Sequence, residues 1–201
     1  MRCLAACVCA VALAAGCSSR QPLQPISLPD LSRLDDSVQA QVRERYERLT
    51  RTVADRSTPA ESLAAAYGEY GMVLQAAEYF DAAEGPYLNA QAISPDEVRW
   101  PYYLAHLYKR KGETDKAEAA FKRALALQPD DLATLIWLGQ LHLDQGKADE
   151  AQAMFQKASA ISPGAVDRSG GRRPPRAARR RVPRAGTDRQ GEAPYRPVAQ
   201  P

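Results

Sequence analysis

This chain of 201 residues carries 27 basic and 24 acidic side chains, which gives a net charge of +3 at pH 7. The total hides a division, because residues 17–163 hold 16 basic against 21 acidic residues, whereas residues 164–201 hold ten arginines against three acidic residues. All four cysteines lie at positions 3, 7, 9 and 17. The chain beyond residue 17 therefore excludes a disulfide framework and a cysteine-based metal site.

Residues 1–16 have the pattern of a secretory signal peptide. Met1-Arg2 precedes an apolar run at 3–15, which is too short to span a bilayer. The run ends in Leu13-Ala14-Ala15-Gly16-Cys17-Ser18, which resembles a bacterial lipoprotein lipobox with Ala14 where that family usually has Leu. The resemblance implies removal of residues 1–16, lipidation of Cys17 and, from Ser18, sorting to the periplasmic face of the outer membrane. The alternative is ordinary secretion, with Cys17 merely inside the signal.

Residues 17–35 are rich in Pro, Ser and Leu, and we interpret them as a tether between lipid and domain. The following residues 36–58 are predicted to form an N-terminal capping helix, because apolar side chains recur there every three or four positions: Val38, Val42, Tyr46, Leu49 and Val53. Thr58-Pro59-Ala60-Glu61 has the form of a capping box with proline at the first helical position. The next helix is therefore expected to begin at Pro59.

From residue 64 to residue 163 one pattern recurs at a fixed interval, the interval that separates Pro95, Pro129 and Pro163. We call this interval the repeat period. The last two copies have residues of the same kind in equivalent places: Leu104 and Leu138, Ala105 and Gly139, Tyr108 and His142, Gly112 and Gly146, Ala117 and Ala151, Phe121 and Phe155. A fixed period of about 34 residues is typical of a helical solenoid, in which about three copies are needed for stability.

Each copy has the pattern of two helices joined by a turn. In the second copy Leu104 and Tyr108 have helical spacing, Gly112 permits a tight turn, and an Ala-rich helix follows. Small residues let the two helices approach closely, while the phenylalanines fill the space between copies. The first copy departs from the pattern with Glu78 at the turn and Gly85-Pro86 in its second helix, where proline is expected to kink or delay that helix.

These residues resemble the tetratricopeptide repeat (TPR) family, with Leu-Gly, Tyr, Ala, Phe, Ala and Pro at its positions. The resemblance implies an all-α solenoid of about three helix pairs, with repeats at about 64–95, 98–129 and 132–163 in a domain spanning 59–163. It also implies a concave partner-binding groove, lined by places 2, 5, 9, 12 and 13 of each leading helix. In the second and third copies those places carry over to the following residues: Arg99, Tyr102, His106, Lys109, Arg110, Ala133, Ile136, Gln140, Leu143 and Asp144.

The groove residues favour a particular kind of partner. Chaperone-tail binders of the family clamp a terminal carboxylate with Lys and Asn at places 5 and 9, and Tyr102 and His106 do not match that pair. A mixed apolar and basic surface suits a helix or extended segment of another protein. The alternative is that Tyr102 and Ile136 only pack locally.

No catalytic set of residues stands out in the sequence. It has no HExxH, Gly-rich phosphate loop or nucleophile elbow, and its carboxylates are scattered along helix faces expected to be solvated. His142 occupies the aromatic core place and is expected to be a packed histidine. His106 is expected to face the groove as a polar contact, and Trp100 to belong to the core. We therefore expect no enzyme activity, no cofactor and no metal.

Residues 164–201 are Arg- and Pro-rich, and few large apolar residues are present to offset the entropy of ordering them. We predict disorder there, with three interpretations: an arm for anionic envelope components, a solvated extension, or an out-of-frame continuation of a gene for a longer repeat protein. Met154, Phe155, Ala158 and Ile161 would lack a following helix on one side, so either a partner covers that face or the domain is incomplete, as the last interpretation expects.

The function expected from these features is a non-catalytic adaptor, anchored in the outer membrane and facing the periplasm, in envelope, pilus or secretion assembly. Nucleic acid is not an expected partner. The alternatives are a docking accessory of a cell-wall enzyme and a truncated product of a longer TPR gene.

Overall fold

A computed structural model describes residues 22–163, and within that range the chain forms helices and no strands. The helices are α1 (Asp36–Ala54), α2 (Ala60–Ala76), α3 (Phe80–Ile93), α4 (Arg99–Lys111), α5 (Thr114–Leu127), α6 (Leu132–Asp144) and α7 (Ala148–Ile161). None of them combines the length and apolar character needed to cross a membrane. The sequence features at residues 1–21 and 164–201, including Cys17 and the Arg-rich segment, lie outside the described residues.

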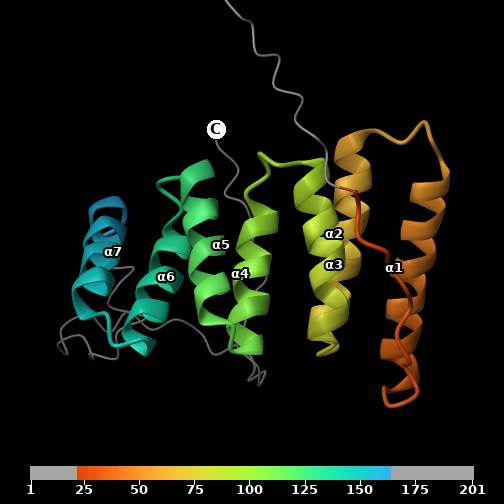
Figure 1. The fold of residues 1–201 in the computed structure, drawn as a ribbon, viewed down its shortest axis with the longest axis horizontal. Coiled ribbons are helices and arrows are strands. Elements are labelled where there is room, and N and C mark those ends of the chain that lie inside the picture. Colours follow the sequence, from red (N-terminus) through yellow and green to blue (C-terminus); the bar gives the residue numbers. More distant parts are fainter. Residues whose placement is uncertain (1–21, 164–201) are drawn as a thin grey trace, which may run out of the picture.

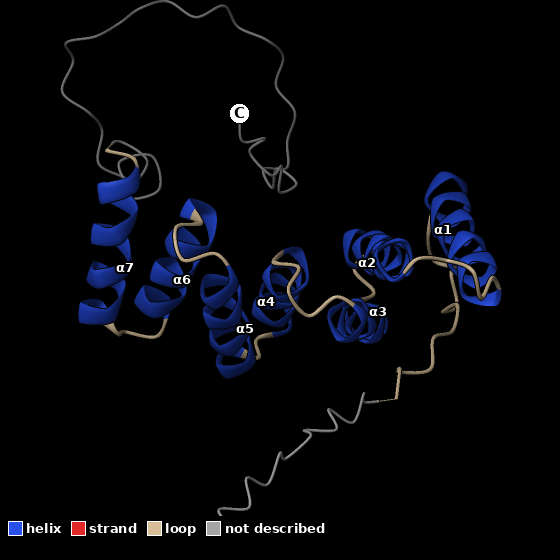
Figure 2. Ribbon diagram, turned by 90° about the horizontal axis from the view of Figure 1, so that it is seen from above, coloured by secondary structure: helices blue, strands red, loops and turns tan. Residues whose placement is uncertain are grey.

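The helices follow one another from α1 to α7 along the longest axis of the molecule (Figure 1), and the view from above shows α2 and α3 one above the other (Figure 2). Each helix packs mainly against its neighbours in sequence. The tightest pairs are α2 with α3, α4 with α5 and α6 with α7, and α1 packs on α2 ahead of the first pair. The predicted all-α helical-repeat fold is therefore confirmed. One continuous core of buried side chains runs through the row.

The turn inside each helix pair has the same backbone geometry. Glu78, Gly112 and Gly146 stand one repeat period apart and have φ angles of 63°, 76° and 74°, in the left-handed region. The amide after each of them donates to a carbonyl five positions earlier, as Tyr79 does to Leu74. This bond closes a helix end of the Schellman type. Glu78 thus adopts the conformation for which the other two copies use glycine.

We expect Glu78→Gly to raise the free energy of unfolding by about 1 kcal/mol, because a residue with a Cβ is strained at positive φ. The exposed ion pair of Glu78 with Arg110, at 3.3 Å, is worth little in comparison. Urea titration of the single variant, with Arg110→Ala as the control for the lost ion pair, measures the difference. Equal stability of Glu78→Gly and the unaltered chain would show that the turn is unstrained.

The predicted delay of the second helix by Pro86 is wrong. The second helix of the first pair begins at Phe80 and runs unbroken through the buried Pro86, so proline does not delay it. The helices α5 and α7 begin at Thr114 and Ala148, which follow Phe80 by one and two repeat periods. All three copies therefore share this start.

The capping box predicted at the start of α2 is wrong as well. The Thr58 hydroxyl donates to the Thr52 carbonyl at 3.1 Å, and the cap of the helix has no side-chain hydrogen bond. The helix begins at Ala60, with Pro59 at the cap position. The prediction missed this bond because its acceptor lies in the preceding helix.

Residues 22–34 also differ from the tether interpreted from the sequence. This extended segment, which we call the N-terminal strap, runs along α1 and α3 (Figure 1). Its Leu31 is only 2% exposed, and its backbone is hydrogen-bonded to side chains of α2 and α3. The described part of the supposed linker is therefore part of the folded domain.

Candidate functional site

The groove predicted from the sequence lies on α4 and α6, the leading helices of the second and third pairs. We call nine of its residues the leading-helix surface: Arg99, Tyr102, His106, Lys109, Arg110, Ile136, Gln140, Leu143 and Asp144. The structure brings them onto two neighbouring helices with a graded exposure. Arg110, Leu143 and Asp144 are exposed, whereas Tyr102 is only 8% exposed and the other five are half-buried.

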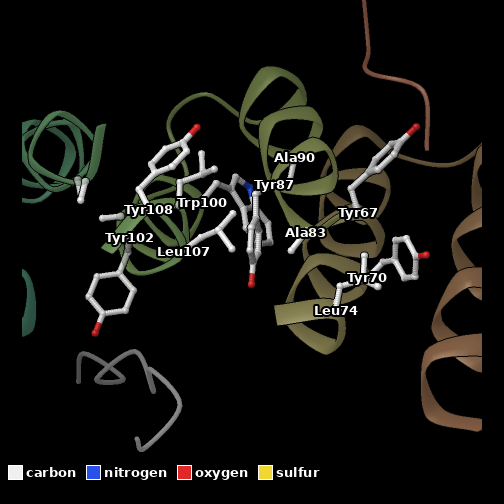
Figure 3. Close-up of a cluster of buried hydrophobic side chains, with 14 of the residues drawn as sticks. Tyr67, Tyr70, Leu74, Ala83, Tyr87, Ala90, Trp100, Tyr102, Leu107 and Tyr108 are labelled. Atoms are coloured by element: carbon white, nitrogen blue, oxygen red, sulfur yellow. The ribbon is translucent and has the colours of Figure 1, made fainter. Parts of the chain in front are cut away.

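An aromatic cluster lies at the centre of this surface. The ring of His106 lies 4.6 Å from that of Tyr102, 5.3 Å from that of Phe121 and 4.9 Å from that of Trp137, in each case edge to face. Tyr102 is directed away from the core around Trp100 and Tyr87 (Figure 3). The cluster joins α4 and α5 to α6, because Trp137 belongs to the next helix pair. Such pairings add to the stability that burial of the rings supplies.

His106 is therefore not the groove-facing polar contact expected from the sequence. Its Nε2 is buried and has no hydrogen-bond partner within the described residues. Burial, reinforced by the nearby Lys109 ammonium, lowers the pKa of His106 to about 4, so the ring is neutral at pH 7. His106 acts as an aromatic ring within the packing between two repeats.

The cations of the leading-helix surface are engaged by neighbours. The Lys109 ammonium lies 4.8 Å from the ring centre of Trp137 and 3.6 Å from the Asp144 carboxylate. The Arg110 guanidinium contacts Glu78 at 3.3 Å, and that of Arg99 contacts Glu97 at 3.1 Å. These partly exposed pairs are weak, so a partner carboxylate is able to replace them. The surface is thus apolar and aromatic with exchangeable charge pairs along it.

Trp137 is the one residue of this surface that the sequence argument missed. It occupies a place of α6 outside the set that the family uses for its groove. A signal was present nonetheless, because Trp137 follows Ala133 by four positions and therefore shares its helix face. The distance between its ring and the Lys109 ammonium shows that Trp137 borders the surface as well as the interface between pairs.

Ion pairs also connect successive helix pairs away from the residues of the leading-helix surface. The Lys111 ammonium is 15% exposed and contacts Glu84 at 2.6 Å and Glu113 at 2.9 Å. One repeat further on, Glu118 contacts Lys147 at 2.8 Å, and hydrogen bonds from Lys122 and Lys147 lower the pKa of Glu118 to about 2. Glu84 and Glu118 stand one repeat period apart and each accepts from a lysine of the following helix pair, but Lys111 and Lys147 do not occupy equivalent places.

Nothing in residues 22–163 assembles into a metal site, since no group of three or more His, Cys, Asp or Glu side chains is placed to hold an ion. His142 is 4% exposed in the core, as expected for a packed histidine. Trp100 is 2% exposed and belongs to the core, also as expected.

Comparison with known proteins agrees with this geometry. Residues 110–168 match the tetratricopeptide repeat family. A MamA crystal structure is similar at 20% identity with a TM-score of 0.52, covering 66% of this chain and 82% of that one. A tetratricopeptide repeat protein from Parabacteroides merdae is similar at 19% identity with a TM-score of 0.56, covering 66% of this chain and 56% of that one. No curated protein matches the chain.

A third similar structure holds a ligand. It is the first TPR of Spaghetti (RPAP3) bound to the HSP90 peptide SRMEEVD, with 19% identity and a TM-score of 0.51, covering 54% of this chain and 86% of that one. The fold described above is that of an all-α helical-repeat solenoid. Within it, residues 110–168 match the tetratricopeptide repeat family.

Proposed function

We propose that this chain is a non-catalytic adaptor that binds a helix or extended segment of another protein on the leading-helix surface. The observation that carries the proposal is the aromatic cluster of Tyr102, His106 and Trp137, bordered by the weakly paired cations Arg99 and Lys109. Aromatic anchors with exchangeable charges around them are the usual centre of a protein-binding surface. The first TPR of RPAP3, which is bound to an acidic peptide, supports this use of the fold.

The ligand class is inferred from the side chains at places 5 and 9 of α4. Tyr102 and His106 stand there and contact each other through their rings, and His106 is neutral at pH 7. Neither supplies the charge needed to hold a terminal carboxylate. We therefore propose an internal segment with an apolar anchor and an acidic residue as the ligand, in place of a free C-terminus.

Replacing Tyr102 and Arg99 together by Ala is expected to weaken capture of the partner at least tenfold, because the pair supplies an aromatic contact and a charge to the surface. The matched control is Lys122→Ala with Arg123→Ala, which removes two exposed cations of α5 instead. Pull-down of the partner measures capture, and far-UV circular dichroism verifies that the helices are retained. Unchanged capture by a variant with intact helicity would show that the leading-helix surface is not the binding site.

We further propose that the adaptor is a lipoprotein anchored through Cys17 on the periplasmic face of the outer membrane. The support is the lipobox-like sequence from Leu13 to Ser18. The expected setting is envelope, pilus or secretion assembly, and the Arg-rich residues 164–201 are proposed to contact anionic envelope components. Docking for a cell-wall enzyme, or a truncated product of a longer gene, are the alternatives.

Cys17→Ser is expected to release the protein from the membrane fraction, because the thiol is the proposed site of acylation. Incorporation of labelled fatty acid into the unaltered chain, and its loss in the variant, measures the modification directly. Cys9→Ser, which lies in the segment proposed to be removed, is the matched control. An unlabelled chain that is released in soluble form would contradict the lipid anchor and leave ordinary secretion.

A further inference from the structure

The N-terminal strap, residues 22–34, is held to the first helix pair through its backbone. The amide N–H of Gln24 donates to Asn89 Oδ1 at 2.6 Å, and Asn89 Nδ2 donates back to the Gln24 carbonyl at 2.9 Å. Asn89 belongs to α3 and is 1% exposed. One buried amide side chain thus satisfies both main-chain groups of a residue that lies 65 positions away in sequence.

Two tyrosines extend this recognition along the strap. The hydroxyl of Tyr70 donates to the Ser27 carbonyl at 3.0 Å, and that of Tyr79 donates to the Asp30 carbonyl at 2.6 Å. All of these bonds go to main-chain atoms at every third position of an extended chain. The three side chains therefore recognise the backbone of a peptide, and these hydrogen bonds do not depend on its side chains.

Apolar contacts select the sequence of the occupant. Leu31 is 2% exposed, and Ile26 and Leu28 pack half-buried against the same core. Gly85 of α3 makes room for Ile26, because a Cβ on this glycine would lie 3.3 Å from the Ile26 side chain. The site fits an extended segment with aliphatic side chains at these three positions.

We propose that Tyr70, Tyr79 and Asn89 form a binding site for an extended peptide, and that the chain's own residues 22–34 are its permanent occupant. Removal of the strap would leave the buried side-chain amide of Asn89 without its two hydrogen bonds to Gln24. A buried polar group without hydrogen-bond partners lowers the stability of the fold. The strap is therefore a rigid junction between the solenoid and whatever precedes residue 22.

The junction has a consequence for the membrane, which rests on the lipid anchor proposed above. Seven residue steps separate Cys17 from Gln24, and an extended chain spans at most roughly 3.5 Å per residue. A lipid on Cys17 would hold the first helix pair within about 25 Å of the bilayer, against about 60 Å for a linker free as far as residue 35. The strap thus sets the adaptor close to the membrane surface.

Hydrogen exchange of the full chain tests the strap itself. We expect slow exchange at the Gln24 amide, and exchange about 10- to 100-fold faster in Asn89→Ala, with α4–α7 unchanged. The double variant Tyr70→Phe with Tyr79→Phe removes two of the bonds with almost no change in volume and is expected to act in the same direction. Gln91→Ala, two positions along α3, is the matched control. Fast exchange in the unaltered chain, or no effect of these variants, would overturn the proposal.

Energy transfer in phospholipid vesicles tests the consequence. A donor dye on Ala40→Cys, at an exposed position of α1, and an acceptor on lipid headgroups should report a short distance, which lengthens when Asn89→Ala frees the strap. If the unaltered protein does not associate with vesicles while its strap still exchanges slowly, the lipid anchor fails and the strap stands. If the protein associates and Asn89→Ala leaves the distance unchanged, the junction does not set the height of the solenoid, and that consequence fails.

A different observation supports a second inference, at the end of the solenoid formed by α7. There a hollow of about 530 Å³ is lined by Leu143, Ala148, Gln152, Phe155, Gln156 and Ser159. Phe155 is half-buried, whereas its equivalent one repeat earlier, Phe121, is fully buried. Leu143 is 47% exposed and Ile161 is 43% exposed.

The preceding repeat shows what fills the equivalent place. The ring centre of Trp137 in α6 lies 4.9 Å from that of His106 and 4.8 Å from the Lys109 ammonium. One repeat period after His106 and Lys109 stand Gln140 and Leu143, and Leu143 lines the hollow. One repeat earlier, the equivalent face is therefore covered by α6, a helix that bears an indole ring. The α7 end face is the next such face along the solenoid.

We infer that the α7 end face binds an amphipathic helix of another protein with an aromatic side chain in the hollow. This inference deepens the proposed adaptor function by adding a second surface. A synthetic peptide of residues 131–145, which carries Trp137 and covers the equivalent face within the chain, is the probe. We expect it to bind the full chain, and to bind at least tenfold more weakly after Trp137→Ala in the peptide or Leu143→Asp in the protein.

Leu143 belongs to both surfaces, so the variant that separates the two sites is Arg99→Ala with Tyr102→Ala, which should leave binding of this peptide unchanged. Absence of binding, or binding insensitive to Trp137, would overturn the inference. Sedimentation of the full chain tests whether the occupant is a second copy of this chain. We expect a monomer, as an occupant from another protein requires. A dimer that Leu143→Asp dissociates would overturn that assignment in favour of a second copy. Peptide binding only by a chain shortened to residue 168 would overturn it in favour of the chain's own C-terminal segment.

Discussion

Gly68→Ala is expected to lower the free energy of unfolding by about 3 kcal/mol, the largest effect of a single methyl group in this chain. A Cβ on Gly68 would lie 2.0 Å from an indole carbon of Trp100, a distance at which the atoms overlap. Trp100 is 2% exposed, so its ring has no free space into which it can move. The gain in helix propensity from Gly to Ala, about 1 kcal/mol, is too small to offset this overlap.

Urea unfolding followed by circular dichroism measures this change, and a double-mutant cycle assigns its cause. In a Trp100→Leu background the overlap is absent, so Gly68→Ala should there be neutral or stabilising. Gly85→Ala is the milder comparison and should cost less, because its new Cβ would crowd the flexible end of the Ile26 side chain at 3.3 Å without overlapping it. An equal loss from Gly68→Ala in both backgrounds would show that the contact between α2 and α4 is not what requires glycine.

The second large effect concerns acid stability and His106. Burial lowers the pKa of His106 to about 4, so the folded state resists a proton that the unfolded chain binds near pH 6.5. The contribution of the neutral His106 to the free energy of unfolding is complete above pH 6.5 and is lost as the pH falls toward 4. The loss amounts to about 3 kcal/mol over that window, since one pKa unit corresponds to about 1.4 kcal/mol.

His106→Phe keeps a ring among Tyr102, Phe121 and Trp137 and removes the titrating group. We expect its stability to change less between pH 7 and pH 4 than that of the unaltered chain, by about 3 kcal/mol. Glu118→Gln is the control for a separate window, because the pKa of Glu118 is about 2 and its contribution is lost only below pH 4.5. Parallel pH profiles for His106→Phe and the unaltered chain would contradict the neutral, buried histidine.

The repeat explains how much of the fold was predictable. The helix pairs follow from a fixed period in which small residues, a turn residue and a proline recur, and each of these acts locally. The turn at Glu78 was expected at its place because the equivalent positions hold Gly112 and Gly146. The three copies share one pattern, so the turn was predictable in the first copy although Glu78 replaces the glycine there.

Two of the parts that were missed, the strap and the packing of His106, depend on contacts between distant residues. The strap looked like a tether because its composition is that of a linker, whereas its partners Tyr70 and Asn89 lie 43 and 65 positions away from the residues they bind. His106 was assigned to the groove from its place in one helix, but Trp137 of the next helix pair covers its ring. The degree of exposure of the predicted residues of α4 and α6 depends on packing that no single repeat contains.

Site-specific photocrosslinking in the native cell tests the central claim, partner binding on the leading-helix surface, most directly. A photoreactive residue at exposed Arg110 should yield one discrete protein adduct, and Tyr102→Ala with Arg99→Ala should abolish it. The same photoreactive residue at exposed Lys122 of α5 should yield none. Adducts at Lys122 but not at Arg110, or an Arg110 adduct unaffected by the double variant, would contradict the claim and place the partner elsewhere on the solenoid.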